Sequence, residues 1–382
     1  MPRALLFLLL AAVLGAVLGL AVLRSRGEGP VVEHVSVSDN RSAISRILGE
    51  RAVETAPGSP AFFRWEPMEE DSARALFNQL ANQSNRFDPN CYFRYRPNVE
   101  LEIANPEHPD GRWTLRTNGL GLRNDGALLA APDLRLLVTG DSHTDGICNN
   151  AEGFPARLAE RLGPGVDVAN TGKSGYSFYN YFGVLESFAA LDPDLFVVCV
   201  YGGNDYAELL LPHHYHQRLP WPDPEFMGKE KLDAVREYLS AGVLPQGFMQ
   251  ATLFQKNPEL EPLCAEAVGL LVDAIGERCA ERGLPWVVVY IPSVLEVQRE
   301  LYEPELSRAV ADLELDERSL GAPERLTAVL FERLRARGVA TLDLRPVFRR
   351  QEGALYWRSD HHLNLEANEL VAAELARLIE SL

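Results

Sequence analysis

Several short polar segments of this chain contain residues that could carry out nucleophilic catalysis. Gly140-Asp141-Ser142 comes first, and Asp360-His361-His362 lies near the C-terminus. A serine hydroxyl is a weak nucleophile until a base takes its proton, and a histidine oriented by a carboxylate is a common base. These residue types therefore predict Ser142 as the nucleophile, His362 as the base and Asp360 as the group that orients it.

Attack on a carbonyl carbon also produces an oxyanion, which needs hydrogen-bond donors. Three donors are predicted: the backbone N–H of Ser142, the backbone N–H of Gly175 and the side-chain amide of Asn204. Gly175 ends the segment Asn170-Thr171-Gly172-Lys173-Ser174-Gly175, and its missing Cβ allows a substrate to approach the backbone closely. This chemistry needs no metal and no cofactor, and none is predicted.

Short apolar runs that alternate with helix-period segments begin at residue 134. This pattern is typical of βαβ units, in which helices cover both faces of a parallel sheet. Ligands bind such sheets at the carboxyl ends of the strands, and the polar segments follow the predicted strands. The strands are expected at residues 134–139, 166–169, 195–201, 286–291 and 339–344.

Taken in order, these segments resemble the sequence blocks of the SGNH or GDSL-type serine esterases. The resemblance covers about residues 134–382 and implies an α/β fold with a flavodoxin-like, doubly wound parallel sheet. It also implies ester chemistry with Ser142 as the nucleophile. The other matching positions are Gly175 of the second block, Asn204 of the third, and Asp360 and His362 of the last.

The sequence departs from the family pattern at three points. His143 follows the serine, where the family usually has leucine or phenylalanine. The last block has D-x-H spacing instead of the commoner D-x-x-H, and a glycine that is frequent soon after the histidine is absent. These departures leave His361 as the alternative base, but the set of matching residues remains intact.

The N-terminus carries an uncharged apolar run at residues 4–23. As a helix, these 20 residues would rise about 30 Å, which is enough to cross the hydrocarbon core of a bilayer. Cleaved signal peptides have shorter apolar stretches, and this run leads directly into Arg24. We therefore predict a transmembrane signal anchor over residues 1–23. Basic residues flank both ends, and we predict export of the catalytic part to the periplasm or the cell exterior.

The rest of the chain divides into three regions. Residues 24–60 show no sustained period and are predicted to be a linker with one short helix at about residues 43–53. Residues 61–130 contain alternating segments typical of a small β-rich lead-in. Residues 131–382 form the predicted hydrolase domain, and its insertion at 209–259 is of the kind that often forms lids or substrate walls.

The composition restricts the classes of partner. The chain has 37 Lys and Arg against 54 Asp and Glu, and this net charge of −17 would repel phosphate backbones. A nucleic-acid partner is therefore not expected. The five cysteines include no CxxC pair, which excludes zinc-finger and thioredoxin motifs. The expected partners are the membrane, through the N-terminal helix, and a small-molecule or polysaccharide acyl ester.

Two alternative functions remain open from the sequence. Asp141-Ser142-His143 also matches the Asp-x-His of calcineurin-like metallophosphoesterases, although the Gly-His-x-His segment of those enzymes is absent. His213, His214 and His216 could bind a metal, but a polar histidine-rich run is more typical of a solvated surface. The second alternative is a catalytically silent binding module with the same fold.

The sequence thus predicts a membrane-anchored serine hydrolase that cleaves or transfers O-acyl esters. Water would accept the acyl group in a hydrolase, and a second hydroxyl would accept it in an acyltransferase. By analogy with the family, carbohydrate of the cell envelope is the leading substrate class. Four aromatic residues after the second block are expected in a helix core rather than on a sugar-binding surface: Tyr176, Phe178, Tyr179 and Tyr181.

Overall fold

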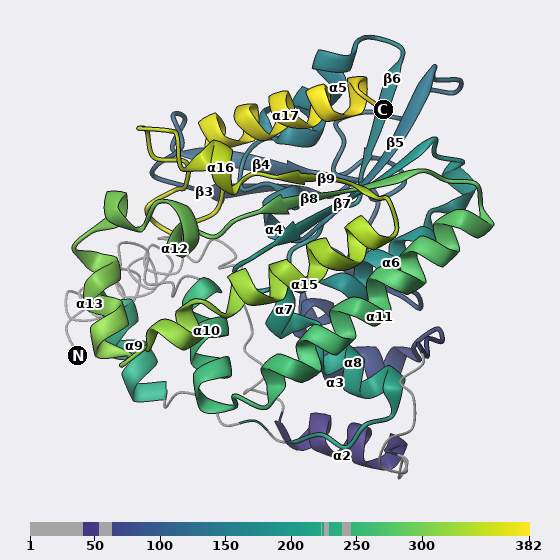
Figure 1. Ribbon diagram of the computed structural model, residues 1–382. Coiled ribbons are helices and arrows are strands. Elements are labelled where there is room, and N and C mark those ends of the chain that lie inside the picture. The colour runs from purple at the N-terminus through teal and green to yellow at the C-terminus, as the bar shows by residue number, and fades with distance from the viewer. Residues whose placement is uncertain (1–40, 53–62, 223, 225–228, 239–245) are drawn as a thin grey trace, which may run out of the picture.

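A five-stranded parallel sheet forms the centre of the protein in the computed structural model, which describes residues 41–52, 63–222, 224, 229–238 and 246–382 (Figure 1). The strand order β6-β5-β7-β8-β9 is the flavodoxin-like order, which confirms the predicted doubly wound parallel sheet. Each strand lies within one residue of its predicted bounds. The strands are β5 (Leu134–Thr139), β6 (Val166–Asn170), β7 (Leu195–Tyr201), β8 (Trp286–Ile291) and β9 (Ala340–Asp343).

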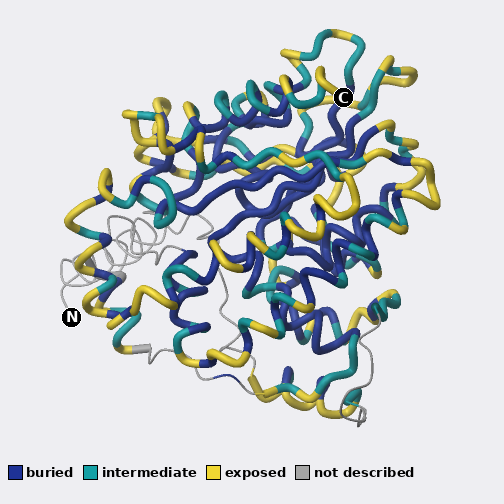
Figure 2. Tube along the Cα trace, viewed as in Figure 1, coloured by how far each residue is buried: buried dark blue, intermediate teal, exposed yellow. Residues whose placement is uncertain are grey.

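Helices cover both faces of this sheet, as Figure 1 shows. On one face lie α5 (Phe154–Leu162) and α17 (Leu365–Glu380), and on the other lie α6 (Phe178–Ser187), α11 (Leu260–Glu281) and α15 (Ala322–Ala336). Side chains that alternate along each strand therefore enter two separate apolar cores. All seven residues of β7 are buried, which explains its unbroken apolar sequence (Figure 2).

Shorter elements connect these layers. They are α4 (Ser142–Asp145), η3 (Asn150–Glu152), η4 (Ala189–Leu191), α12 (Val294–Val297), η5 (Arg299–Tyr302), α13 (Glu305–Asp312), α14 (Glu317–Leu320) and α16 (Arg345–Phe348). The five cysteines are all free and buried.

The lead-in contains two short helical segments and two separate hairpins. Its elements are α3 (Glu70–Leu76), η2 (Asn78–Ala81), β1 (Asn85–Asp88), β2 (Tyr92–Tyr95), β3 (Glu100–Ala104) and β4 (Arg112–Arg116). β1 pairs with β2 and β3 with β4, both antiparallel. Tyr92 and Phe93 are buried in the same apolar core as Tyr176 and Tyr179 of the main domain. The lead-in is therefore packed onto the domain that follows it.

The N-terminal predictions fall only partly within the described residues. Helix α2 (Arg41–Arg51) lies in the predicted linker close to the expected short helix, and it buries Ile44, Ile47 and Leu48. The predicted anchor at residues 4–23 lies outside the described residues. None of the helices in the described part has the length and hydropathy that a membrane crossing needs.

The insertion after β7 contains α8 (Leu210–Gln217), α9 (Lys229–Tyr238) and α10 (Gln246–Lys256), preceded by α7 (Asp205–Glu208). The expectation that its histidines lie on a solvated surface is wrong, because His213, His214 and His216 are all buried. His216 Nε2 lies 2.7 Å from the Tyr92 hydroxyl, and His213 Nδ1 lies 3.0 Å from the Tyr179 hydroxyl. Aromatic hydroxyls thus provide polar partners for two of these three buried histidines.

Candidate active site

The predicted nucleophile lies at the carboxyl end of β5. The strand ends at Thr139 and α4 begins at Ser142, so two residues make the turn. Asp141 caps the helix, because its carboxylate accepts a hydrogen bond from the His143 backbone N–H at 2.9 Å. This capped turn holds the serine at the edge of the sheet where ligands of this fold bind. In this structure Ser142 is 0% exposed.

The histidine of the last sequence block lies next to this serine, although 220 positions of chain separate them. His362 Nε2 lies 2.8 Å from Ser142 Oγ. On the other side of the ring, His362 Nδ1 lies 3.2 Å from Asp360 Oδ2, and the His362 backbone N–H donates to Asp360 Oδ1 at 3.0 Å. With its proton on Nδ1, His362 donates to Asp360 and accepts the Ser142 hydroxyl proton.

The residue between them adopts a conformation that separates the two histidines. His361 has a φ of +59°, in the left-handed region that residues with a Cβ seldom occupy. Its ring packs edge-on against Tyr302, with ring centroids 5.2 Å apart. The contact with Ser142 is therefore made by His362, and the alternative base His361 lies against another aromatic ring.

The charges around the histidine favour its use as a base. Burial acts to raise the pKa of Asp360, but the neighbouring His362 overcomes this effect and holds that pKa below its usual value. Burial acts to lower the pKa of His362, but the Asp360 carboxylate reverses the effect and the pKa is raised. The pair therefore combines an ionised carboxylate with an imidazole that readily takes up a proton.

A second carboxyl group lies beside the nucleophile. Asp141 Oδ2 is 3.3 Å from Ser142 Oγ, compared with 2.8 Å for His362 Nε2. Burial raises the pKa of Asp141 to about 7, although the hydrogen bond from the His143 backbone acts against the shift. The serine proton thus has two possible acceptors, of which His362 is nearer.

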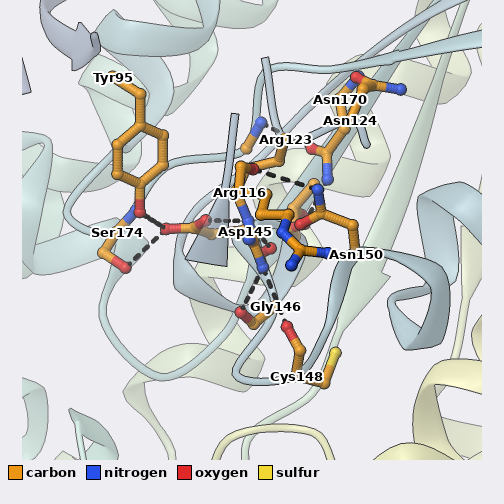
Figure 3. Close-up of polar contacts among 12 residues, drawn as sticks. Tyr95, Arg116, Arg123, Asn124, Asp145, Gly146, Cys148, Asn150, Asn170 and Ser174 are labelled. Carbon is orange, nitrogen blue, oxygen red and sulfur yellow. Dashed lines mark hydrogen bonds and ion pairs between the residues drawn. The ribbon is translucent and has the colours of Figure 1, made fainter. Parts of the chain in front are cut away.

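The glycine-containing second block is attached to α4 by hydrogen bonds to a buried carboxylate. The carboxylate of Asp145, at the end of α4, accepts hydrogen bonds from the backbone N–H and the hydroxyl of Ser174 at 3.1 and 3.0 Å. The same carboxylate accepts from the Tyr95 hydroxyl at 2.7 Å and lies 2.9 Å from Arg123 Nε (Figure 3). Tyr95 and Arg123 come from the lead-in, which therefore helps to position the second block relative to Ser142.

Gly175 follows Ser174 in a conformation that a larger residue would not tolerate. Its φ is +83°, and a Cβ at this position would lie 2.2 Å from Gln79 Nε2. The positive φ of the turn favours glycine here, and the end of the Gln79 side chain lies where a Cβ would be.

The third predicted donor, Asn204, follows β7 directly before α7. Its side chain is buried, and neither amide atom meets hydrogen-bond geometry with another described residue. Burial raises the pKa of the nearby Glu208 to about 8, and the Asn204 amide acts against that shift. The Asn204 amide thus lies beside Glu208, just after the carboxyl end of β7, where ligands of this fold bind.

His143, the main departure from the family pattern, fills an aromatic position. Its ring stacks on Tyr201 with centroids 3.7 Å apart and lies 4.8 Å from the His362 ring. Within the residues described here, no group of three or more His, Cys, Asp or Glu side chains could hold a metal ion. The ligand set that the metallophosphoesterase alternative requires is therefore not found in that part of the chain.

One residue that contacts the nucleophile was missed by the sequence analysis. The Gln246 amide, at the start of α10 in the insertion, donates from Nε2 to Ser142 Oγ at 3.3 Å. A single glutamine in a polar insertion carries no sequence signal for this position. Asp145 was also missed, although it lies only three residues after the predicted nucleophile.

Comparison with known families matches the C-terminal part of the chain. Residues 249–382 match the family described as SGNH hydrolase-like domain, acetyltransferase AlgX. The matched region includes Asp360 and His362, whereas Ser142, Gly175 and Asn204 precede it. No curated protein matches the chain.

Several solved structures are similar at low sequence identity. The acetyl xylan esterase AlAXEase has a TM-score of 0.37 and 14% identity, covering 64% of this chain and 100% of its own. A catalytic mutant of the acetylxylan esterase Axe2 from Geobacillus stearothermophilus has a TM-score of 0.36 and 13% identity, with 65% and 95% covered. The lipase/acylhydrolase from Enterococcus faecalis has a TM-score of 0.37 and 14% identity, with 65% and 96% covered.

Proposed function

This chain contains an SGNH hydrolase-like domain, and we propose that it cleaves or transfers O-acyl esters with Ser142 as nucleophile, His362 as base and Asp360 as the orienting carboxylate. The observation that carries the proposal is the continuous chain of polar contacts from Ser142 Oγ to His362 at 2.8 Å and from His362 to Asp360 at 3.2 Å. Both distances lie close to what proton transfer between such groups requires.

The steps of the reaction follow from these contacts. Ser142 Oγ forms a bond to the acyl carbon while its proton passes to His362 Nε2, and the carbonyl electron pair moves onto oxygen. The backbone N–H groups of Ser142 and Gly175 and the Asn204 amide are the proposed donors to that oxyanion. When the oxyanion collapses, the bond to the leaving alcohol breaks and the alcohol takes the proton from His362. Water or a second hydroxyl then releases the acyl group by the same steps.

A fluorophosphonate probe tests this assignment, because it reacts only with a serine whose hydroxyl is activated as a nucleophile. We expect the wild-type chain to be labelled and the Ser142→Ala variant to remain unlabelled. Ser187→Ala is the control, because the Ser187 hydroxyl, at the end of α6, donates to Asp88 and takes no part in the contacts of Ser142. Labelling should persist in this control.

Absence of labelling in the wild type would contradict the proposal. In that case, chelator-sensitive activity on a phosphodiester would favour the metallophosphoesterase alternative. Absence of both activities would favour the binding module.

Acyl transfer to a hydroxyl rather than to water is favoured by the burial of the site. Ser142 is 0% and His362 4% exposed. Exclusion of water protects a reactive intermediate from hydrolysis, so a bound hydroxyl would be the better acceptor. The family matched by residues 249–382 is also described as an acetyltransferase.

We expect an oligosaccharide acceptor to compete with water for the acyl group. The measurement compares release of p-nitrophenol from p-nitrophenyl acetate with the amounts of acetylated oligosaccharide and free acetate, by mass spectrometry. In a transferase the acetylated sugar rises with acceptor concentration and free acetate falls. If free acetate equals p-nitrophenol at every acceptor concentration, the chain is a hydrolase.

We further propose an O-acetylated carbohydrate of the cell envelope as the substrate. The description of the matched family supports the acetyl group. The apolar run at residues 4–23 supports a membrane anchor, with the catalytic domain exported to the periplasm or the cell exterior, where such a carbohydrate would be accessible.

A further inference from the structure

The insertion brings an additional hydrogen-bond donor to the nucleophile. Gln246 is the first residue of α10 and is 7% exposed. Its Nε2 donates to Ser142 Oγ at 3.3 Å across 104 positions of chain. Gln246 precedes the residues that match the SGNH hydrolase-like family, and it belongs to none of the four sequence blocks.

Helix α10 is attached to the third block by a second glutamine. Gln250 follows Gln246 by one helical turn and lies on the same side of the helix. Its Nε2 donates to the Gly202 carbonyl at 2.7 Å, and its Oε1 accepts from the Ala207 N–H at 3.0 Å. These two bonds connect the helix to the loop that carries Asn204. The position of Gln246 is therefore coupled to that of a proposed oxyanion donor.

The start of the helix is also closely packed. Gly247 lies against the Leu295 side chain of α12, because a Cβ at this position would lie 2.9 Å from Leu295 Cδ1. Phe248 is buried in the core on the α17 side of the sheet. Gln246 is thus held at the nucleophile by the packing of the residues that follow it.

Hydrogen-bond chemistry determines the role of each contact at Ser142 Oγ. The hydroxyl has one proton, and His362 Nε2 at 2.8 Å is its nearest acceptor. An amide nitrogen can only donate, so Gln246 donates to an oxygen lone pair. The same oxygen bonds to the acyl carbon during attack, and the carbonyl oxygen is then only one carbon atom away. A donor that already lies 3.3 Å from Oγ is therefore close to the place where the oxyanion would form.

We propose that Gln246 is a catalytic residue that donates to Ser142 Oγ before attack and to the acyl oxyanion as it forms. This inference rests on the proposed serine-ester chemistry and adds a side-chain donor from the insertion to that mechanism. The Oγ–carbon bond forms, the carbonyl electron pair moves to oxygen, and the hydroxyl proton goes to His362. Gln246 keeps both amide protons and stabilises the new charge, which then returns to the carbonyl when the leaving alcohol departs.

The test replaces the donor while keeping the length of the side chain. Gln246→Met is expected to lower kcat for p-nitrophenyl acetate by about 10²-fold and to change KM by less than about threefold, because the bond strengthens in the transition state. The rate of fluorophosphonate labelling should fall in the same variant, because phosphonylation passes through a similar negative oxygen. Thermal unfolding of each variant separates this effect from loss of structure.

Gln255→Ala is the matched control on the same helix. Gln255 is directed away from the site, because its Nε2 donates to the Glu314 carbonyl and its Oε1 accepts from the Asp316 N–H. This variant should lose hydrogen bonds that anchor α10 and retain kcat within about twofold.

Three outcomes would overturn the inference. One is a Gln246→Met variant with kcat unchanged, and another is an equal loss in Gln255→Ala, which would assign the effect to the helix as a whole. The third is a wild-type chain with no acyl chemistry and no labelling at Ser142, which would overturn the proposed function as well. Only the third result bears on Ser142 as the nucleophile. Failure of the Gln246 inference can therefore be told apart from failure of the proposed function.

Discussion

Alanine in place of His362 is expected to lower kcat for ester turnover by roughly 10⁴–10⁶-fold, because the Ser142 hydroxyl then lacks its nearest proton acceptor. Because the ring contacts Oγ at 2.8 Å and acts on the proton of the nucleophile, its loss should affect kcat and change KM little. Asp141 remains the other acceptor, at 3.3 Å, and the residual rate measures what that carboxylate can supply. Steady-state kinetics on p-nitrophenyl acetate provide the measurement.

His361→Ala is the matched control for this experiment. Its ring packs on Tyr302, so the variant should lose packing energy while kcat stays within about tenfold of the wild type. Circular dichroism and thermal unfolding of both variants show whether the fold is retained. Equal losses of kcat in the two variants would mean that His362 is not the base.

Asparagine in place of Asp360 is expected to lower kcat by about 10⁴-fold, because the amide favours the wrong tautomer of the imidazole. The same substitution should also shift the acidic limb of the pH–activity profile to lower pH. Burial lowers the pKa of His362, and the Asp360 carboxylate is the largest influence that raises it. Without the carboxylate, burial dominates and the pKa of His362 falls.

The base must be neutral to accept the serine proton, so activity is present above the pKa of His362 and is lost as the pH falls through it. In the wild type, the acidic limb of kcat/KM should lie above the usual histidine value of about 6.5, because the folded pKa is raised. In Asp360→Asn the limb should move to lower pH. An Asp343→Asn variant, which removes the partner of Arg345 at the end of β9, should leave the limb in place. A limb that is the same in Asp360→Asn and the wild type would contradict the assigned pair.

The parallel sheet could be predicted from the sequence because its signals are local. A strand that is buried on both faces needs an unbroken apolar run, and residues 195–201 provide one. The prediction of helix core is confirmed for Phe178, Tyr179 and Tyr181, which are buried in α6, whereas Tyr176 is buried just before that helix. The prediction for the histidines of α8 was wrong because their burial depends on distant contacts, which local signals do not reveal. A polar run resembles a surface loop when the buried Tyr92 and Tyr179 hydroxyls that satisfy it come from distant segments.

Ser142, His362 and Asp360 lie in contact with one another, but the support around them could not be anticipated. Tyr95 and Arg123 hold Asp145 from a region that the sequence analysis treated as separate. Gln246 reaches Ser142 from an insertion whose pattern showed only polar and proline-rich pieces. These contacts join residues 22 to 104 positions apart, and no periodicity encodes such pairings.

The sequence by itself determined the sheet and the residue types available at its carboxyl edge, because strand burial and turn chemistry act over a few neighbouring residues. Only the tertiary structure decided which of two adjacent histidines contacts Ser142. That choice depends on the left-handed backbone at His361 and on packing against Tyr302. It also decided that the insertion supplies Gln246, because a contact between distant segments exists only once the chain has folded around a common core.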